Sequence, residues 1–341
     1  MAMAPDTALP TPRRAVRTAH RERLLADIGG TNARFAWQRH AGAPIEAVQT
    51  LPCAGFETLA DAVQAYLGLV NRPAPPLCAI AIANPVLGDW VQMTNHHWRF
   101  SIAALRTRFG FVDLHVLNDF TALALALPAL QPGDLQQVGG GAAVPDAAVG
   151  LIGPGTGLGV SGLVPDGRGG WSPLQGEGGH VTLAAVTPRE HAVIGQLALR
   201  HGHVSAERAV CGQGLVALHR ALWALDRPRD PAPDLAAADI TAAALADSDP
   251  ACAEALQLFC AFLGATAGNL ALTLGARGGI YIGGGIVPRL GAWFVRSDFR
   301  ARFEGKGRFS AYLAPIPVWV IGTAQSPALL GAARALDQAR P

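Results

Sequence analysis

Lysine is nearly absent from this sequence, since Lys306 is the only one among 27 basic residues. A Walker-type P-loop needs a lysine directly after its glycine loop, and no Gly-x-x-x-x-Gly-Lys-Ser/Thr segment occurs. This absence excludes P-loop chemistry. A bound phosphate would have to be met by backbone amides, Mg²⁺ or arginine.

Cysteine pairs at metal-binding spacing are also absent. The five cysteines form no Cys-x-x-Cys pair, which disfavours a zinc site. An odd number of cysteines suits reduced thiols in a cytosolic protein. The cysteines are Cys53, Cys78, Cys211, Cys252 and Cys260.

Long hydrophobic runs and an excess of charge are not apparent either. We expect no apolar run to approach the length that spans a bilayer, and the N-terminus lacks a basic segment followed by an apolar core. A net charge of +2 argues against a dedicated nucleic-acid binder. We therefore expect a cytoplasmic protein with neither membrane nor nucleic-acid partners, preceded by a flexible extension over residues 1–23.

A glycine-rich hairpin stands near the N-terminus. An apolar strand over Leu24–Asp27 leads into Gly29, Gly30, Thr31 and Asn32, and a second strand follows over Arg34–Gln38. Glycines let backbone N–H groups approach a phosphate closely, and Asp27 can hold Mg²⁺ or its waters. The pattern predicts a phosphate-binding turn that carries a carboxylate.

A related hairpin appears again over Val149–Val164, with the turn Gly155-Thr156-Gly157 between two apolar strands. Two such turns could hold a polyphosphate from opposite sides. The duplication predicts an ATPase-type cleft built from two α/β halves.

The 341 residues, 50% hydrophobic and 15% charged, suffice for two domains with substantial cores. We place the small α/β domain at 24–129 plus about 321–341, the large α+β domain at 130–320, and a hinge near the start of Gln131–Asp146. Further strands are predicted over Cys78–Ala83, Val112–Asp119, Gly278–Gly285 and Ile316–Ile321. Helices are predicted over Phe56–Val70, Thr121–Leu127, Pro188–Arg200, Ala206–Val210, Leu215–Ala224 and Ala251–Leu274, from Pro288, and over Pro327–Gln338.

Seven motifs resemble the bacterial glucokinases of the hexokinase–actin–Hsp70 fold group, outside the repressor–kinase (ROK) branch, which often carries a cysteine-rich zinc motif. The resemblance covers about Leu24 to Ala333. The motifs are Asp27-Ile-Gly-Gly-Thr-Asn-Ala-Arg34, Gly88-Asp-Trp-Val-Gln-Met-Thr-Asn95, Leu117-Asn-Asp-Phe-Thr121, Gly155-Thr-Gly-Leu-Gly159, Gly176-Glu-Gly-Gly-His180, His203-Val-Ser-Ala-Glu-Arg208 and Gly283-Gly-Gly-Ile-Val-Pro-Arg289.

The resemblance implies a two-domain actin-like, ribonuclease H-like ATPase fold with the active site in the interdomain cleft. It also implies ATP- and Mg²⁺-dependent phosphorylation of D-glucose to glucose 6-phosphate by a homodimer. The implied sugar ligands are Asn118, Asp119, Glu177, His180 and Glu207. The implied nucleotide contacts are Ala26, Asp27, Ile28, Gly29, Gly30, Thr31, Asn32, Gly155, Thr156, Gly157, Gly283, Gly284 and Gly285, with Asp27 also toward Mg²⁺.

Asp119 lies at the C-terminal end of a predicted strand, at the edge where open α/β sheets place their ligands. As general base it would accept the proton of an attacking hydroxyl. Its rival role is the N-cap of the following helix, which the residues alone favour. The neighbouring Asn118 suits sugar hydroxyls or a simple turn.

Glu177 and His180 lie in a glycine-rich loop that lets both side chains face one small ligand. A metal site is the rival role, but one Glu and one His are a poor ligand set. Glu207 stands in the first turn of a predicted helix, where a carboxylate also complements the helix dipole. Three carboxylates would bind a hexose through charge-assisted hydrogen bonds.

Other functions remain open at this point. A broader hexokinase would accept mannose or fructose as well. A sugar-sensing regulator would have lost catalysis, although no extension large enough for a helix-turn-helix is present. A chaperone-like or filament ATPase of the same fold group has no use for the sugar-binding set. His96, His97 and Trp98 are expected to shape a domain surface.

Overall fold

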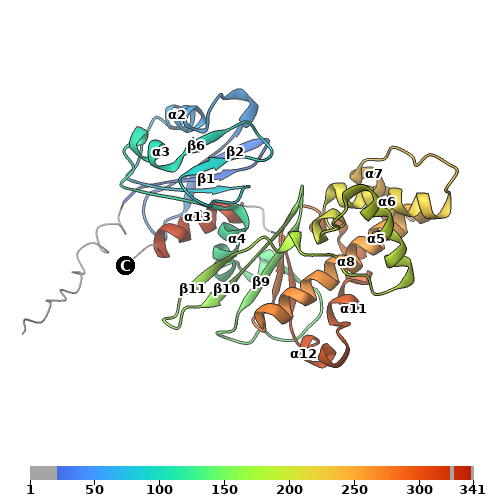
Figure 1. Cartoon of the computed structure of the whole chain (residues 1–341). Helices are drawn as coiled ribbons and strands as arrows, with labels where there is room; N and C mark the ends of the chain where they lie inside the picture. The colour runs from blue at the N-terminus through green and yellow to red at the C-terminus, as the bar shows by residue number, and fades with distance from the viewer. Residues whose placement is uncertain (1–20, 323–325, 339–341) are drawn as a thin grey trace, which may run out of the picture. The chain divides into compact units, whose positions relative to one another are not determined.

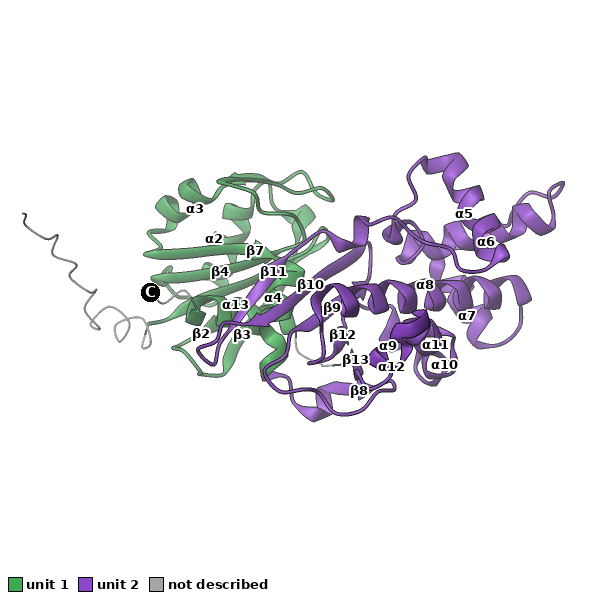
Figure 2. Ribbon diagram, turned by 60° about the horizontal axis from the view of Figure 1, so that its bottom comes forward, with its two compact units in different colours: residues 1–128, 326–341 green, residues 129–325 purple. Residues whose placement is uncertain are grey.

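The computed structural model describes residues 21–322 and 326–338. Its contacts divide the chain into two compact units, residues 1–128 with 326–341 (unit 1) and residues 129–325 (unit 2), coloured separately in Figure 2. Most of the predicted N-terminal extension lies outside the described residues. Its last residue, Arg23, was assigned wrongly, because Arg23 begins a strand and is buried.

Unit 1 is built on a five-stranded sheet of order β3-β2-β1-β4-β7. The first three strands form an antiparallel meander, and β1, β4 and β7 run parallel. β4 is apolar throughout and fully buried, as expected of a parallel strand covered on both faces. The strands are β1 (Arg23–Ile28), β2 (Asn32–Gln38), β3 (Ile45–Pro52), β4 (Leu77–Ile82) and β7 (Asp113–Asn118), beside a small ribbon of β5 (Trp90–Gln92) and β6 (Arg99–Ser101).

Four α-helices complete the described part of unit 1: α2 (Leu59–Leu69), α3 (Ile102–Phe109), α4 (Asp119–Ala126) and α13 (Pro327–Gln338). The C-terminal α13, red in Figure 1, packs on α4, β1 and β4. At Gly331 a Cβ atom would lie only 1.7 Å from the carbonyl oxygen of Ala122, so the crossing of α13 and α4 requires glycine. The predicted terminal helix is confirmed.

Unit 2 repeats the same arrangement, with a six-stranded sheet of order β11-β10-β9-β12-β13-β8. Here too an antiparallel meander of three strands continues into parallel strands. The strands are β8 (Leu135–Gln137), β9 (Val149–Pro154), β10 (Leu158–Pro165), β11 (Trp171–Gln175), β12 (Ile280–Ile282) and β13 (Val318–Ile321).

The helices of unit 2 surround α8 (Pro250–Leu274), whose buried residues join the larger core. The others are α5 (Pro188–His201), α6 (Gly212–Asp226), α7 (Ala237–Leu245), α9 (Val287–Leu290), α10 (Ala292–Arg296), α11 (Phe299–Glu304) and α12 (Ser310–Leu313). The 25 residues of α8 are long and apolar enough to cross a membrane, so the expectation of no such run is wrong. Because 78% of its apolar window is buried inside the protein, α8 has the environment of a core helix.

The structure confirms the two predicted hairpins and the longer predicted helices. The sequence patterns missed β3, β8, β11, α3 and α7, and the short β5 and β6. The surface role expected for Trp98 is wrong, because its indole belongs to the core of unit 1 and donates to the carbonyl of Phe56. The five cysteines are free and buried.

Candidate active site

Polar side chains gather where the parallel strands of unit 1 end. The strand register aligns Ile28 with Ile82 and Ile82 with Asn118, so the carboxyl ends of β1, β4 and β7 share one edge. Asp27 lies in β1 at this edge, and Asn118 and Asp119 follow one another from β7 into α4.

Asn118 is the N-cap of α4. Its side-chain oxygen accepts from the N–H groups of Phe120 and Thr121, at 2.9 and 3.2 Å. The capping role considered for Asp119 is therefore wrong, because Asp119 is the first residue of the helix and its neighbour supplies the cap. The Asp119 carboxylate accepts from the N–H of Phe120 at 2.9 Å.

The environment of Asp119 disfavours its charge. Burial raises its pKa to about 6, and the nearby Asp27 carboxylate adds to the rise, against the opposing hydrogen bond from Phe120. A carboxylate with this pKa is mostly ionised at neutral pH and holds a proton better than an ordinary aspartate. These properties suit a general base.

Asp27 is held by two donors on the same oxygen. The Ser326 hydroxyl donates to its Oδ2 at 2.7 Å, and Arg34 Nη1 lies 3.3 Å from that atom. Burial raises the pKa of Asp27, while the Ser326 hydrogen bond and the Arg34 charge lower it. The hydrogen bond from Ser326 and the ion pair with Arg34 thus both contact Oδ2.

The first glycine turn is tightly supported. The N–H of Gly29 donates to the carbonyl of Asn32 at 2.9 Å, and a Cβ on Gly30 would lie 3.0 Å from that of Asn95. Cys53 supports the turn through its N–H, which donates to the carbonyl of Thr31 at 2.8 Å. The side chains of Ala26 and Ile28 are buried, which leaves only their backbone for a ligand.

The second glycine turn is joined to a carboxylate from elsewhere in unit 2. Glu207 accepts from the N–H of Leu158 at 2.8 Å. A Cβ on Gly157 would lie only 2.5 Å from its Oε2. Glu207 belongs to the short 3₁₀ helix Ala206–Arg208, and its hydrogen bond to the second turn goes beyond the simple dipole role considered for it.

The third glycine run lies beside the same hairpin. The N–H of Gly283 donates to the carbonyl of Ile152 at 2.9 Å. Gly284 has φ +80°, and a Cβ there would lie 2.3 Å from the carbonyl oxygen of Pro154. Only glycine fits this position.

Glu177 and His180 are exposed and close to each other, with 4.0 Å between Oε2 and Nε2. Their loop packs on β10, since Cβ atoms on Gly178 and Gly179 would meet Val160 and Leu158. Unit 2 thus brings Glu177, His180 and Glu207 to the same strand, while Asn118 and Asp119 belong to unit 1.

Sequence reasoning missed Arg34, Ser326 and Asn84. Arg34 faces Asp27 in the antiparallel register, so a hairpin model would have found it. Asn84 accepts from the N–H of Thr94 through its side chain and from Asn118 Nδ2 through its carbonyl, at 3.1 and 3.5 Å. No sequence signal links Ser326 with Asp27.

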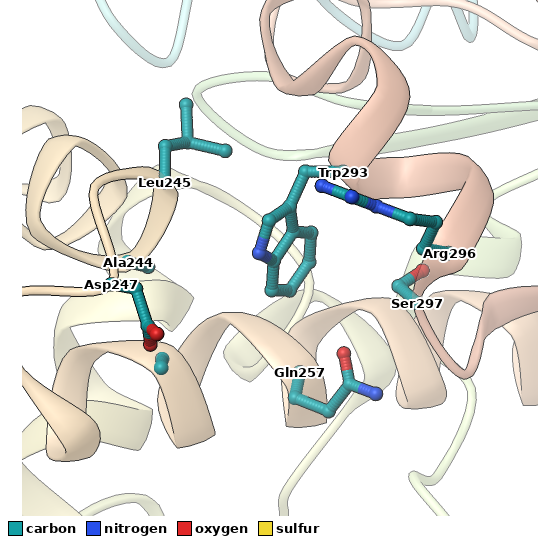
Figure 3. Close-up of a pocket in the computed structure, with 8 residues that line it drawn as sticks. Ala244, Leu245, Asp247, Gln257, Trp293, Arg296 and Ser297 are labelled. Atoms are coloured by element: carbon teal, nitrogen blue, oxygen red, sulfur yellow. The ribbon is translucent and has the colours of Figure 1, made fainter.

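A separate cavity of about 350 Å³ opens between α7, α8 and α10 in unit 2, and the Trp293 ring is among the side chains that line it (Figure 3). None of the candidate residues lines it. It is not part of the site described above.

Fold and sequence comparisons define the class as a sugar kinase of the actin-like ATPase fold. A glucokinase from an Antarctic psychrotroph matches with a TM-score of 0.83 and 38% identity, over 92% of this chain and 98% of that one. A ROK-family glucokinase from Streptomyces griseus, solved with glucose and AMPPNP, is only 20% identical with a TM-score of 0.61, and so shows the fold alone.

The glucokinase family model matches residues 24–339. The glucokinase of Aromatoleum aromaticum is 60% identical over 93% of this chain and 95% of its own length. That of Chromobacterium violaceum is 56% identical over 91% and 88%. The chain belongs to the glucokinase family, as the sequence motifs indicated.

Proposed function

We propose that this chain phosphorylates the 6-hydroxyl of D-glucose with ATP, and that Asp119 is the general base. Family membership supports the activity. The geometry that supports the assignment of the base is a half-buried carboxylate at the carboxyl edge of a parallel sheet, where partial burial raises its pKa to about 6. Asn118 caps helix α4, so the Asp119 carboxylate is not needed as the N-cap.

Proton removal is only part of the catalysis. The transition state of phosphoryl transfer is loose, so positioning and charge neutralisation carry most of the rate. In this proposal Asp119 orients the attacking hydroxyl and takes its proton as the phosphoryl group leaves ADP.

Asp27 is the residue that we assign to Mg²⁺. Mg²⁺ keeps several waters and is usually bound by one or two carboxylates together with substrate phosphates. A single carboxylate whose printed contacts both involve Oδ2 fits this pattern, and no group of three metal-binding side chains occurs in the described chain. When bound, the ion would neutralise the charge that develops on the phosphates.

Two glycine turns are assigned to the phosphates of ATP. The first spans Gly29–Asn32 and the second Gly155–Gly157, and both present backbone N–H groups. The run Gly283–Gly285 is assigned to the adenosine, because it offers backbone with no side chain in the way.

The sugar site in this proposal consists of Asn118, Asp119, Glu177, His180 and Glu207. Carboxylates accept hydrogen bonds from several hydroxyls of a hexose. A site of this kind rejects an analogue that lacks a hydroxyl, by a factor on the order of 10⁴.

We also propose that the protein acts in the cytoplasm as a homodimer, without nucleic-acid or membrane partners. Light scattering after size-exclusion chromatography would test whether it is a dimer.

The test is phosphoryl transfer from MgATP to glucose, mannose, fructose and N-acetylglucosamine, with sugar-free ATP hydrolysis measured alongside. We expect transfer largely confined to glucose. Comparable rates with mannose and fructose would indicate a broader hexokinase. Glucose binding without transfer to any sugar would indicate a regulator and contradict the proposal.

A further inference from the structure

We propose that Ser326 is a positioning residue for catalysis, which fixes the Asp27 carboxylate so that its Oδ1 faces the metal and the phosphates. This inference rests on the role assigned to Asp27 above. Ser326 is 299 residues away from Asp27 in the sequence and donates its hydroxyl hydrogen to Oδ2 at 2.7 Å.

Two donors on one oxygen restrict the rotation of a carboxylate. Arg34 and Ser326 both approach Oδ2, at 3.3 and 2.7 Å, so the plane of the carboxylate and the direction of Oδ1 are set together. Arg34 is 40% exposed at its side chain, so water competes for its long contact. The short bond from Ser326 is therefore the stronger restraint.

Ser326 is itself held in place by the helix that it precedes. Halfway along α13, Gly331 packs on the backbone of Ala122 in α4, without room for a Cβ. Near its end, buried Arg23 donates to the Ala333 carbonyl at 3.3 Å and to Asp337 at 2.8 Å. A helix anchored at its middle and its end carries a pre-organised hydroxyl, which is what a supporting residue of an active site requires.

Helix α13 also contacts the surroundings of both proposed functional carboxylates of unit 1, Asp27 and Asp119. Ala122 lies in the first turn of α4, which begins with Asp119. α13 thus contacts Asp27 through Ser326 and the helix of Asp119 through Gly331. We infer that α13 maintains the separation between the proposed base and the proposed metal-binding carboxylate.

The decisive measurement is the affinity of the enzyme for Mn²⁺–ADP, read from the electron paramagnetic resonance signal of free Mn²⁺. Removing a hydrogen-bond partner of a metal ligand typically weakens metal binding by about 10- to 100-fold. For Ser326→Ala we expect a dissociation constant about tenfold higher, a kcat about tenfold lower at saturating Mg²⁺, and an unchanged KM for glucose. Calorimetry should give an unchanged affinity for metal-free ADP.

Two further substitutions separate positioning from helix capping. Ser326→Thr keeps the hydroxyl and should restore Mn²⁺–ADP affinity to within about twofold, since threonine also caps helices. Ser326→Gly keeps an acceptable cap but has no hydroxyl and adds no charge, so the folded protein should bind Mn²⁺–ADP as weakly as the alanine variant.

Ser101→Ala is the matched control. Ser101, the N-cap of α3 in unit 1, also donates its hydroxyl hydrogen to an aspartate, with 2.6 Å to Asp89 Oδ2, and lies outside the candidate site. It should lower the unfolding midpoint and leave Mn²⁺–ADP affinity unchanged.

The outcomes distinguish this inference from the proposed function. If Asp27→Asn leaves Mn²⁺–ADP affinity unchanged, the role assigned to Asp27 is wrong, and this inference is wrong with it. If Asp27→Asn weakens binding but Ser326→Ala changes only the unfolding midpoint, as Ser101→Ala does, Ser326 merely starts a helix.

Discussion

The two glycine hairpins have the same backbone arrangement but obtain their carboxylates differently. Each is the first pair of strands in a meander that continues into parallel strands. In β1–β2 the carboxylate, Asp27, belongs to the hairpin and is held by the side chains of Arg34 and Ser326. In β9–β10 the carboxylate, Glu207, comes from outside and is held by the N–H of Leu158.

This difference shows how a duplicated fold acquires two chemical roles. The backbone of a glycine turn is suited to phosphate in both units. The side chains that reach each turn differ, and we assign one carboxylate to the metal and the other to the sugar. Function therefore depends on these additions to the shared fold.

Among the substitutions considered, we expect the largest effect on activity from one at Asp119 in unit 1. Asp119→Asn should lower kcat by about 10²- to 10⁴-fold, the range for loss of a general base. The protein should remain folded at pH 7, because burial already disfavours the charged form of this side chain. Steady-state kinetics with a circular dichroism melt would test this, and nearly full activity in the folded variant would contradict the assignment.

The packing of α13, the helix that follows Ser326, can be disrupted at Gly331. Gly331→Ala should lower the free energy of unfolding by about 2 kcal/mol, because the added methyl group would overlap the Ala122 carbonyl. Denaturant unfolding would measure the change. The control is Gly195→Ala in α5, where the Cβ meets nothing within 4 Å, and there we expect a gain of about 0.5–1 kcal/mol.

The pKa of Asp119 predicts how activity depends on pH. With a pKa of about 6, ionised Asp119 and the kcat should both fall about tenfold between pH 7.5 and pH 5. Because its folded pKa lies above the ordinary value of 3.8, the folded state holds the extra proton between about pH 4 and pH 6. This group therefore adds stability as the pH falls, and unfolding through it cannot explain the acid loss of activity. A flat profile down to pH 5 would argue against Asp119 as the base.

The smallest effect is expected at the second hairpin. Gly157→Ala would displace the Glu207 carboxylate and should raise the KM for glucose about fivefold, since a hydrogen bond to a charged group contributes about 1.5–3 kcal/mol and is only partly lost. At Gly155 a Cβ meets nothing within 4 Å, so Gly155→Ala should leave the KM for glucose unchanged. Equal values for the two variants would show that Glu207 does not contact the sugar.

Much of the fold was predictable from local patterns. The hairpins combine apolar strands with glycine turns, β4 is apolar throughout, and α8 is long and mostly apolar. The patterns missed β3, whose residues are half-buried or exposed, and α7, a short alanine-rich helix after a proline-rich stretch. These elements have little apolar periodicity of their own.

The candidate site was predictable only in part. The motifs pointed to Asp27, Asp119 and Glu207 as carboxylates, but the residues alone favoured a capping role for Asp119. Asn118 performs that role in the structure, because its side chain reaches the N–H groups of the following residues from the end of β7.

The sequence by itself determined the two glycine turns, the carboxylate of Asp27 beside the first turn and the family, because these depend on residue types at short spacing. Only the tertiary structure decided which groups hold the carboxylates. Ser326 reaches Asp27 because α13 packs back onto unit 1, and the pKa of Asp119 rises because the packed chain removes water from it. Contacts between residues far apart in the sequence follow from packing, which no local pattern records.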